Sequence, residues 1–206
     1  MSSSSSRPIE DVWPLSHDFS PYDALLFDLD GTLVDTMPLH GLAYAAVFQG
    51  MGYAFTMDDY LAHVGPPARI AIPGFALAAG MGAIDDAMIA QIHADKKGRF
   101  NEVLAKEKAP SLAASALLAR LAGRKPMALV SSGNRDGVEA ILRTMDWRKY
   151  FGAVVSGDDV SKGKPHAEPY LTGARLLGVD PARCLVFEDT GAGVASGLAA
   201  GMAVVH

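Results

Sequence analysis

Five short apolar runs are spread along the chain, and small or polar residues follow nearly every one of them. The runs cover residues 24–27, 127–130, 153–155, 184–187 and 203–205. Each run is apolar at every position rather than at alternate positions, which is typical of strands covered on both faces. The pattern therefore predicts the buried strands of a parallel sheet.

Helical patterns lie between these runs. They cover residues 112–121, 136–145, 169–177 and 192–200. In the second of them, Val138, Ile141, Leu142 and Met145 recur at the spacing of one helix face. Since strand and helix alternate, we expect an α/β fold with an open, doubly wound parallel sheet.

One region breaks this alternation. Between residues 38 and 106 the pattern predicts helices at 38–48, 57–63, 69–79 and 84–104 and no strand. Prolines at 38 and 110 are typical of joints between domains. We therefore expect a helical cap (37–107) inserted into an α/β core (21–36 and 108–206). The serine-rich start, 1–20, is expected to be disordered or extended.

Composition and charge exclude several classes of protein. The net charge of -5 argues against a nucleic-acid binder, which needs a basic face. No apolar run is long enough for a membrane span, and the first residues lack the apolar stretch of a signal peptide. The single cysteine, Cys184, cannot form an internal disulfide, which favours a cytoplasmic location. Its apolar neighbours predict an inert core thiol.

Polar residues gather just after the apolar runs, where parallel strands place ligand sites. They are Asp28 and Asp30, Ser131 and Ser132, Lys164, and Glu188 and Asp189. The first pair is informative by itself, because two carboxylates at the mouth of a buried strand are costly without a compensating cation. Mg²⁺, a hard cation with oxygen ligands, is the natural candidate.

Four segments resemble the signatures of the haloacid dehalogenase superfamily of phosphotransferases. They are DLDGTLVDT from Asp28, Ser131 after MALV, Lys164 in SKGKPHAEPY, and Glu188–Asp189 in LVFEDTGAGV. They occur in the family's order, and the helical insert falls where that family's cap inserts. The small cap is similar to the branch that holds β-phosphoglucomutases and fructose-1-phosphatase-like proteins.

The resemblance implies roles for the residues of the core. Asp28 would attack phosphorus and form an aspartyl-phosphate, and Asp30 would act as general acid and base. An aspartate at position 30 points away from dehalogenation and toward phosphoryl transfer. Lys164 would neutralise charge on Asp28 and the phosphoryl group; Lys162 is a competitor for this role.

The resemblance also implies the ligands of a metal and a phosphate. Asp28, the carbonyl of Asp30 and Asp189 would hold Mg²⁺, with Glu188 as a direct or water-mediated ligand. Ser131 and the region of Ser132 would hold phosphate oxygens. Ordinary structural roles compete with these: Ser131 as a helix N-cap, and Glu188–Asp189 as a capped helix start.

The cap is expected to choose the substrate. His40 falls where related sugar-phosphate enzymes carry a histidine facing the site, and Arg69 could grip a phosphate or a sugar hydroxyl; both could equally be surface or packing residues. The first hypothesis is a phosphatase of small phosphorylated metabolites, above all sugar phosphates. A phosphomutase of the β-phosphoglucomutase kind shares every core residue, and a catalytically silent binding protein is a third hypothesis. No obligate protein partner is indicated.

Overall fold

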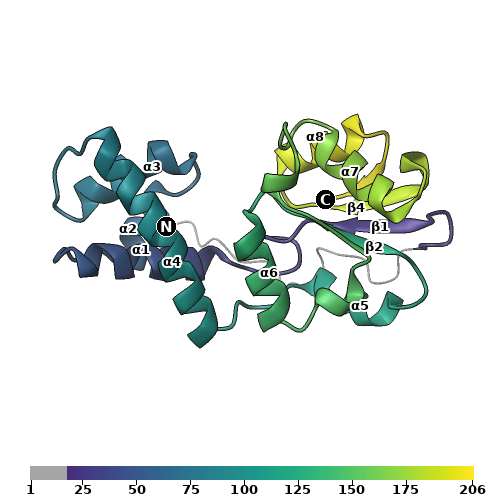
Figure 1. Ribbon diagram of the computed structural model, residues 1–206, viewed down its shortest axis with the longest axis horizontal. Helices are drawn as coiled ribbons and strands as arrows, with labels where there is room; N and C mark the ends of the chain where they lie inside the picture. The colour runs from purple at the N-terminus through teal and green to yellow at the C-terminus, as the bar shows by residue number, and fades with distance from the viewer. Residues whose placement is uncertain (1–17) are drawn as a thin grey trace, which may run out of the picture. The chain divides into compact units, whose positions relative to one another are not determined.

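The computed structural model describes residues 18–206, so the prediction for the serine-rich start falls almost wholly outside the described residues. The described residues divide into two compact units, 18–35 with 110–206, and 36–109. The first unit holds the sheet and the second is helical (Figure 1). The expected joints near residues 36–38 and 108–110 lie next to these bounds.

The sheet unit contains five parallel strands in the order β3-β2-β1-β4-β5. The strands are β1 (Ala24–Phe27), β2 (Met127–Val130), β3 (Ala153–Val155), β4 (Cys184–Phe187) and β5 (Ala203–Val205). All five coincide with the apolar runs of the sequence, and the parallel, doubly wound sheet is confirmed. Strands β1 to β4 are buried at every position. This agrees with their sequences, which are apolar at every position rather than at alternate positions.

Helices cover both faces of this sheet. They are α5 (Ala116–Leu121), α6 (Arg135–Thr144), α7 (Glu168–Leu177) and α8 (Gly191–Ala199). Right-handed crossovers from β1 through β2 to β3 place α5 and α6 on one face, and the crossovers from β3 through β4 to β5 place α7 and α8 on the other. Figure 1 shows α7 and α8 on the side of the sheet opposite α5. Single turns of 3₁₀-helix occur at Ala113–Ser115, Arg148–Tyr150, Gly157–Asp159 and Pro181–Arg183.

The core beneath α7 is built from alternate residues of the strands. Leu26, Val130 and Val186 face the same cluster as Tyr170 and Ala174 of α7. On β1 and β4, Phe27 and Phe187 are register partners, and their rings stack at 4.6 Å between centroids. The close pairing of β1 and β4 holds the residues that follow the two strands side by side.

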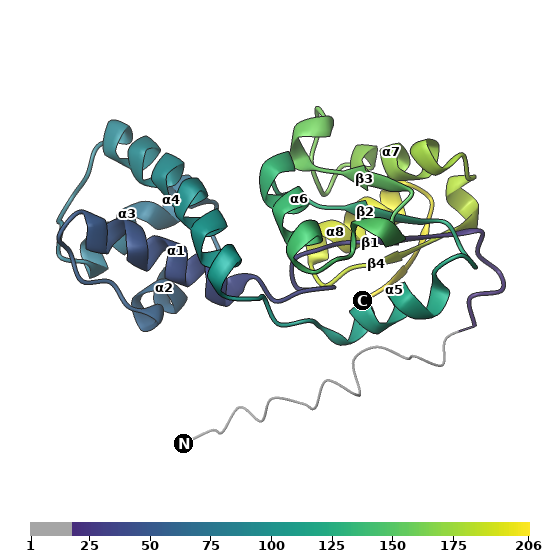
Figure 2. The same ribbon diagram turned by 60° about the horizontal axis from the view of Figure 1, so that its bottom comes forward.

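The second unit consists of α1 (Met37–Gly50), α2 (Met57–His63), α3 (Ala68–Ala78) and α4 (Asp86–Lys106), as Figure 2 also shows. Polar caps begin two of these helices: Thr56 forms a capping box with Asp59, and Asp85 caps α4. Aromatic rings fill the interior, with Phe75 in contact with Tyr44, Phe55 and Tyr60. No strand occurs between residues 36 and 109.

The strand order fixes where a ligand site can form. From β1 the chain goes to β2 on one side, whereas from β4 it goes to β5 on the other. The crevice outside the carboxyl ends of β1 and β4 is therefore the switch point of the sheet, where ligands bind in open α/β folds. Asp28 and Glu188 are the first residues after these two strands. Among the described residues, no helix has the length and apolarity that crossing a membrane requires.

Candidate active site

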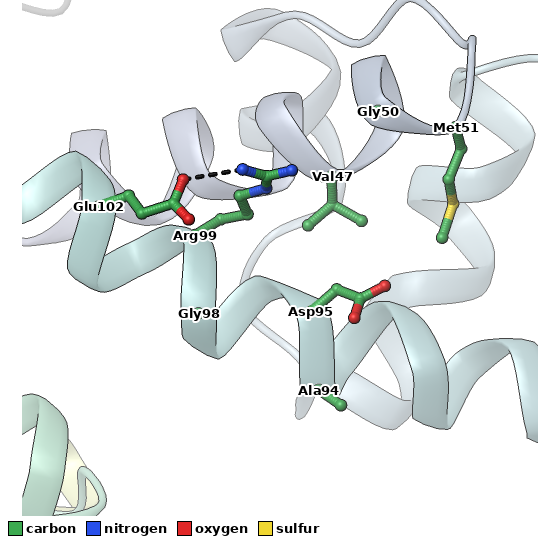
Figure 3. Close-up of a pocket in the computed structure, with 8 residues that line it drawn as sticks. All are labelled: Val47, Gly50, Met51, Ala94, Asp95, Gly98, Arg99 and Glu102. Atoms are coloured by element: carbon green, nitrogen blue, oxygen red, sulfur yellow. Dashed lines mark hydrogen bonds and ion pairs between the residues drawn. The ribbon is translucent and has the colours of Figure 1, made fainter.

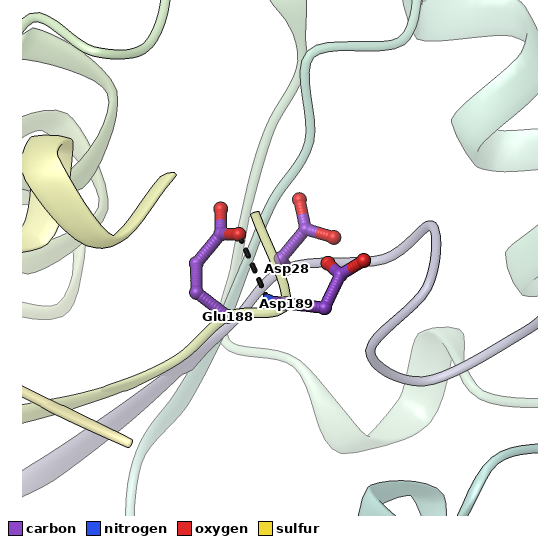
Figure 4. A group of neighbouring side chains, drawn as sticks. All are labelled: Asp28, Glu188 and Asp189. Atoms are coloured by element: carbon purple, nitrogen blue, oxygen red, sulfur yellow. Dashed lines mark hydrogen bonds between the residues drawn. The ribbon is translucent and has the colours of Figure 1, made fainter. Parts of the chain in front are cut away.

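The register of β1 and β4 brings Asp28 next to Glu188. The backbone N–H of Asp28 donates to the carbonyl oxygen of Phe187 at 3.0 Å, which continues the ladder one step beyond the strands. Asp28 and Glu188 are 7% and 0% exposed, so both carboxylates lie inside the protein. Figure 4 shows them together with Asp189 at the strand ends.

These three carboxylates form a group that fits a cation. One oxygen from each of Asp28, Glu188 and Asp189 lies within 4.8 Å of the others. The two buried carboxylates, Asp28 and Glu188, both pair with the ammonium of Lys164, and Asp189 adds a third carboxylate beside them. Such an excess of buried negative charge is unfavourable unless a cation compensates it, and an all-oxygen donor set suits Mg²⁺ or a similar hard ion.

Asp189 is held against the loop that follows β1. The hydroxyl of Thr32 donates to Asp189 Oδ1 at 3.2 Å. Gly31 has a φ of +88°, and a Cβ there would lie 2.1 Å from Asp189 Oδ2. Only glycine allows both the backbone angle and the close approach. Burial raises the pKa of Asp189 and the Glu188 charge adds to this, although the Thr32 hydroxyl acts in the opposite direction.

Lys164 is the central cation of the site. Its ammonium donates to Asp28 Oδ1 at 2.6 Å, to Glu188 Oε1 at 2.5 Å and to the carbonyl oxygen of Val130 at 3.0 Å. Its side chain is only 6% exposed. Lys162, the alternative of the sequence analysis, has an exposed side chain two residues earlier in the same loop.

The charges of this group shift one another's protonation. Burial, aided by the Glu188 and Asp30 carboxylates, raises the pKa of Asp28 to about 8 against the opposing Lys164 charge. Burial also acts to raise the pKa of Glu188, but the Lys164 ammonium and other donors outweigh it and hold that pKa below its ordinary value. The two carboxylates likewise raise the pKa of Lys164 in spite of its burial. A bound cation would lower the pKa of Asp28 and keep it ionised.

Glu188 accepts hydrogen bonds on both of its oxygens. Oε1 accepts from Lys164 and from the hydroxyl of Tyr170 at 2.9 Å. Oε2 accepts from the backbone N–H groups of Asp189 and Thr190 at 3.1 and 3.2 Å and from the Thr190 hydroxyl at 3.0 Å. The carboxylate lies so close to α8 that a Cβ on Gly193 would be 1.8 Å from it.

Ser131 points into the same end of the sheet. It is 3% exposed, its hydroxyl donates to Asp30 Oδ2 at 3.3 Å, and its oxygen accepts from the N–H of Gly133 at 3.0 Å. The alternative of a helix N-cap is wrong for Ser131, because α6 begins later and Asn134 caps it. Ser132 is exposed at the same strand end.

Glu188 and Asp189 directly precede the capped start of α8, but neither of them is its N-cap. Thr190 is the N-cap of α8, and its hydroxyl oxygen accepts from the N–H of Gly193 at 3.0 Å. Thr190 stands where the resembled family commonly has serine. In the loop of Lys164, Glu168 stands where aspartate is common, and its carboxylate accepts from the N–H groups of Ser161 and Lys162 at 2.7 and 3.0 Å. Thr190 and Glu168 therefore each form hydrogen bonds within their own loop.

The two candidate residues of the helical unit have partners within that unit. Lys96 donates to His40 Nδ1 at 2.7 Å and lies over the rings of Tyr44 and Phe100. Burial, followed by the Lys96 charge, lowers the pKa of His40 to about 3, so His40 accepts as a neutral imidazole. Arg69 pairs with Asp86 at 3.4 Å, with both side chains mostly exposed.

The larger of two surface pockets in the helical unit contains neither candidate residue. It has a volume of about 470 Å³ and lies between α1 and α4. Figure 3 shows its lining, with Arg99 and Glu102 joined by an ion pair at 2.8 Å on its rim. The smaller pocket, of about 290 Å³, is lined by Arg69, Asp86, Ile89, Ala90 and His93.

Sequence reasoning missed two residues of these clusters. Tyr170 falls within the helix predicted over residues 169–177, and a helical pattern says nothing of where a hydroxyl points. Lys96 lies next to Lys97 within the helix predicted over residues 84–104, and the pattern does not distinguish the two lysines. The signal that could have found Tyr170 is the choice of tyrosine rather than phenylalanine at a buried position near Lys164.

Comparison with known proteins decides the family. The sequence profile of haloacid dehalogenase-like hydrolases matches residues 22–201. The chain belongs to this family. The family typically uses a metal ion, in agreement with the acidic cluster at the switch point.

Several members of the haloacid dehalogenase-like hydrolases resemble this one over most of their length. The fructose-1-phosphate phosphatase YqaB of Escherichia coli is 32% identical over 188 residues, which are 91% of this chain and 97% of that protein. A phosphorylated carbohydrates phosphatase of Thermotoga maritima is 32% identical over 184 residues, 89% of this chain and 84% of that one. The solved structure of CbbY from Rhodobacter sphaeroides in complex with phosphate has a TM-score of 0.72 and 28% identity, and covers 89% and 84% of the two chains.

Proposed function

We propose that this hydrolase is a Mg²⁺-dependent phosphatase of small phosphorylated metabolites, above all sugar phosphates. The observation that carries the proposal is the contact of Lys164 Nζ with Asp28 Oδ1 at 2.6 Å, beside the carboxylates of Glu188 and Asp189. A buried carboxylate between an ammonium and a cation site is suited to attack an anionic phosphoryl group. The phosphatase relatives named above support the same reaction class.

Asp28 and Asp30 would share the chemistry. An oxygen of Asp28 attacks phosphorus, the ester P–O bond breaks, and Asp30 gives its proton to the departing oxygen. Asp30 then takes a proton from water, which attacks the phosphorus of the aspartyl-phosphate and releases inorganic phosphate and the Asp28 carboxylate. Lys164 stabilises the charge that develops between Asp28 and the phosphoryl oxygens.

Other residues of the core would hold the metal and the phosphate. Asp28, the carbonyl of Asp30 and Asp189 would hold Mg²⁺, with Glu188 as a direct or water-mediated ligand. When bound, the ion screens the repulsion between the nucleophile and the phosphate. Ser131, whose hydroxyl already lies near Asp30, and the exposed Ser132 would hold phosphate oxygens.

The predicted cap, residues 37–107, lies within the helical unit 36–109 and would select the substrate. His40, held by Lys96, and Arg69, on the rim of the smaller pocket, are its candidate substrate contacts. We further propose that the enzyme works in the cytoplasm without an obligate protein partner.

The test is phosphate release from a panel of sugar phosphates with and without Mg²⁺. Asp28→Asn should lower turnover by roughly a thousandfold or more with the fold intact, and substantial residual turnover would contradict the assignment of the nucleophile. Asp30→Asn should slow a sugar phosphate more than an activated aryl phosphate, because the aryl leaving group needs no proton. Isomerisation that needs a bisphosphate activator and releases no phosphate would instead identify a phosphomutase.

A further inference from the structure

A buried hydroxyl behind Lys164 has no part in the proposed chemistry. Tyr170 is 0% exposed, and its ring packs in the core between α7 and the sheet. The ammonium of Lys164 lies over that ring, 5.0 Å from its centroid. Phenylalanine would fill the same space, so packing explains the ring and leaves the hydroxyl unexplained. The hydroxyl donates to Glu188 Oε1 at 2.9 Å.

Glu188 is saturated with donors. A carboxylate has about four lone-pair sites, whereas Glu188 accepts from five groups: Lys164 Nζ, the Tyr170 hydroxyl, two backbone N–H groups and the Thr190 hydroxyl. A metal ligand needs a lone pair aimed at the ion. Asp189, in contrast, accepts at Oδ1 from the hydroxyl of Thr32 and lies against Gly31.

Lys164 is fixed between two carboxylates. Its three N–H donors go to Asp28, Glu188 and the Val130 carbonyl. Asp28 and Glu188 therefore compete for the same ammonium. The Tyr170 hydroxyl also donates to Glu188 Oε1. This second hydrogen bond stabilises the negative charge on that oxygen and so weakens its attraction for Lys164.

We propose that Tyr170 is a positioning residue, whose hydroxyl holds Glu188 as the counter-ion of Lys164, outside the inner coordination sphere of the metal. Lys164 thereby stays on Asp28. The inference rests on the proposed function for its kinetic consequence, but the placement of Glu188 can be tested without turnover.

The first arm measures Mn²⁺ binding to the substrate-free enzyme by electron paramagnetic resonance of the free ion. Glu188→Gln and Asp189→Asn each remove one negative charge and keep the side-chain shape, so the two variants are matched in charge and size. We expect Asp189→Asn to weaken binding at least about tenfold more than Glu188→Gln does. Equal losses would make Glu188 a direct ligand and overturn the proposal.

Tyr170→Phe gives the first arm a second readout. Loss of the hydroxyl removes one of the five donors to Glu188 and leaves the carboxylates of Asp28 and Asp189 unchanged, so Mn²⁺ should bind this variant at least as tightly as wild type. A merely structural loosening of the site would weaken Mn²⁺ binding, and a loss of more than about threefold would contradict the proposal.

The second arm is a double-mutant cycle on phosphate release. Tyr170→Phe should lower kcat about tenfold and change KM by less than about twofold, because Lys164 acts as charge develops rather than in substrate capture. In the Glu188→Gln background the same substitution should cost less than about twofold. A tenfold loss in both backgrounds would show that the hydroxyl acts independently of Glu188 and would refute the proposal.

Tyr60→Phe is the matched control, since Tyr60 is also buried but belongs to the helical unit. It should leave kcat within about twofold of wild type. Failure of the proposed function is a separate result: a wild-type enzyme that releases no phosphate from any ester refutes the phosphatase, while the Mn²⁺ arm still decides where Glu188 lies.

Discussion

The substitution Gly31→Ala should separate metal binding from folding. Gly31 lies in the turn after β1, with a φ of +88°, and its N–H donates to the Val34 carbonyl at 2.9 Å. A Cβ at this position would stand 2.1 Å from Asp189 Oδ2 and 2.7 Å from Asp189 Cγ. The new methyl group and the carboxylate cannot both keep their places.

Two costs follow, and they have different magnitudes. The left-handed backbone costs an alanine roughly 1–2 kcal/mol, of which roughly 0.4–1 kcal/mol is offset by the lower entropy of the unfolded chain. The net loss of about 1 kcal/mol corresponds to a Tm lower by roughly 2–4 °C for a protein of this size. The carboxylate of Asp189 must retreat by about 1 Å to reach van der Waals contact, a displacement that can cost on the order of 100-fold in rate.

Gly123→Ala is the control for the first cost. Gly123 has a φ of +72°, and nothing lies within 4 Å of a Cβ built on it. Both variants should lose a few degrees of Tm in thermal melts followed by circular dichroism. Only Gly31→Ala should lose about 100-fold in phosphate release and need a higher Mg²⁺ concentration for half-maximal rate. A Gly31→Ala enzyme with normal Mg²⁺ dependence and a rate within threefold of wild type would refute the assignment of Asp189 to the metal.

Three further predictions concern other parts of the molecule. The pKa of His40 in the folded protein, about 3, lies below the ordinary value of about 6.5. Below pH 6.5 the unfolded chain binds a proton that the folded protein does not, so the free energy of unfolding should fall as the pH drops toward 3, by on the order of 2 kcal/mol at pH 5. His40→Asn should lose this part of the pH dependence in urea titrations at pH 7.5 and 5, and an unchanged difference would show that His40 titrates normally. Cys184 is 0% exposed, and burial raises the pKa of its thiol to about 11, so Ellman's reagent should react with it only after denaturation; fast labelling of the native enzyme would contradict its place in the core. Glu168→Ala removes the acceptor of two N–H groups in the loop of Lys164. It should lower kcat roughly three- to thirtyfold in the phosphate-release assay, whereas Glu168→Asp should recover part of the loss. Equal rates for the two variants would show that the carboxylate does not order this loop.

The sequence predicted the strands well because burial on both faces leaves a direct trace. Runs such as 24–27 and 184–187 are apolar at every position, and only covered strands need that. The order of the strands leaves no such trace. The strand order depends on which crossovers run to each side of β1. The pairing of β1 with both β2 and β4 is therefore known only from the structure.

The limits of prediction at the site have a similar cause. Serine is a common N-cap residue, but two further residues separate Ser131 from Asn134. Asn134 directly precedes α6 and caps it instead. Lys96 and Lys97 are indistinguishable by spacing, and only the packing of α4 against α1 brings Lys96 to His40. Contacts between distant segments decide both cases.

The pair Glu188–Asp189 shows how local geometry divides two like residues. Consecutive side chains leaving a strand point to opposite sides, so the two adjacent carboxylates after β4 have different hydrogen-bond partners. Glu188 turns inward to Lys164 and Tyr170, and Asp189 turns toward Gly31 and Thr32. The inward side has a cation of its own in Lys164, whereas the Thr32 hydroxyl that donates to the Asp189 carboxylate is neutral. A divalent cation is therefore needed most on the side of Asp189, where Gly31 leaves room for the carboxylate.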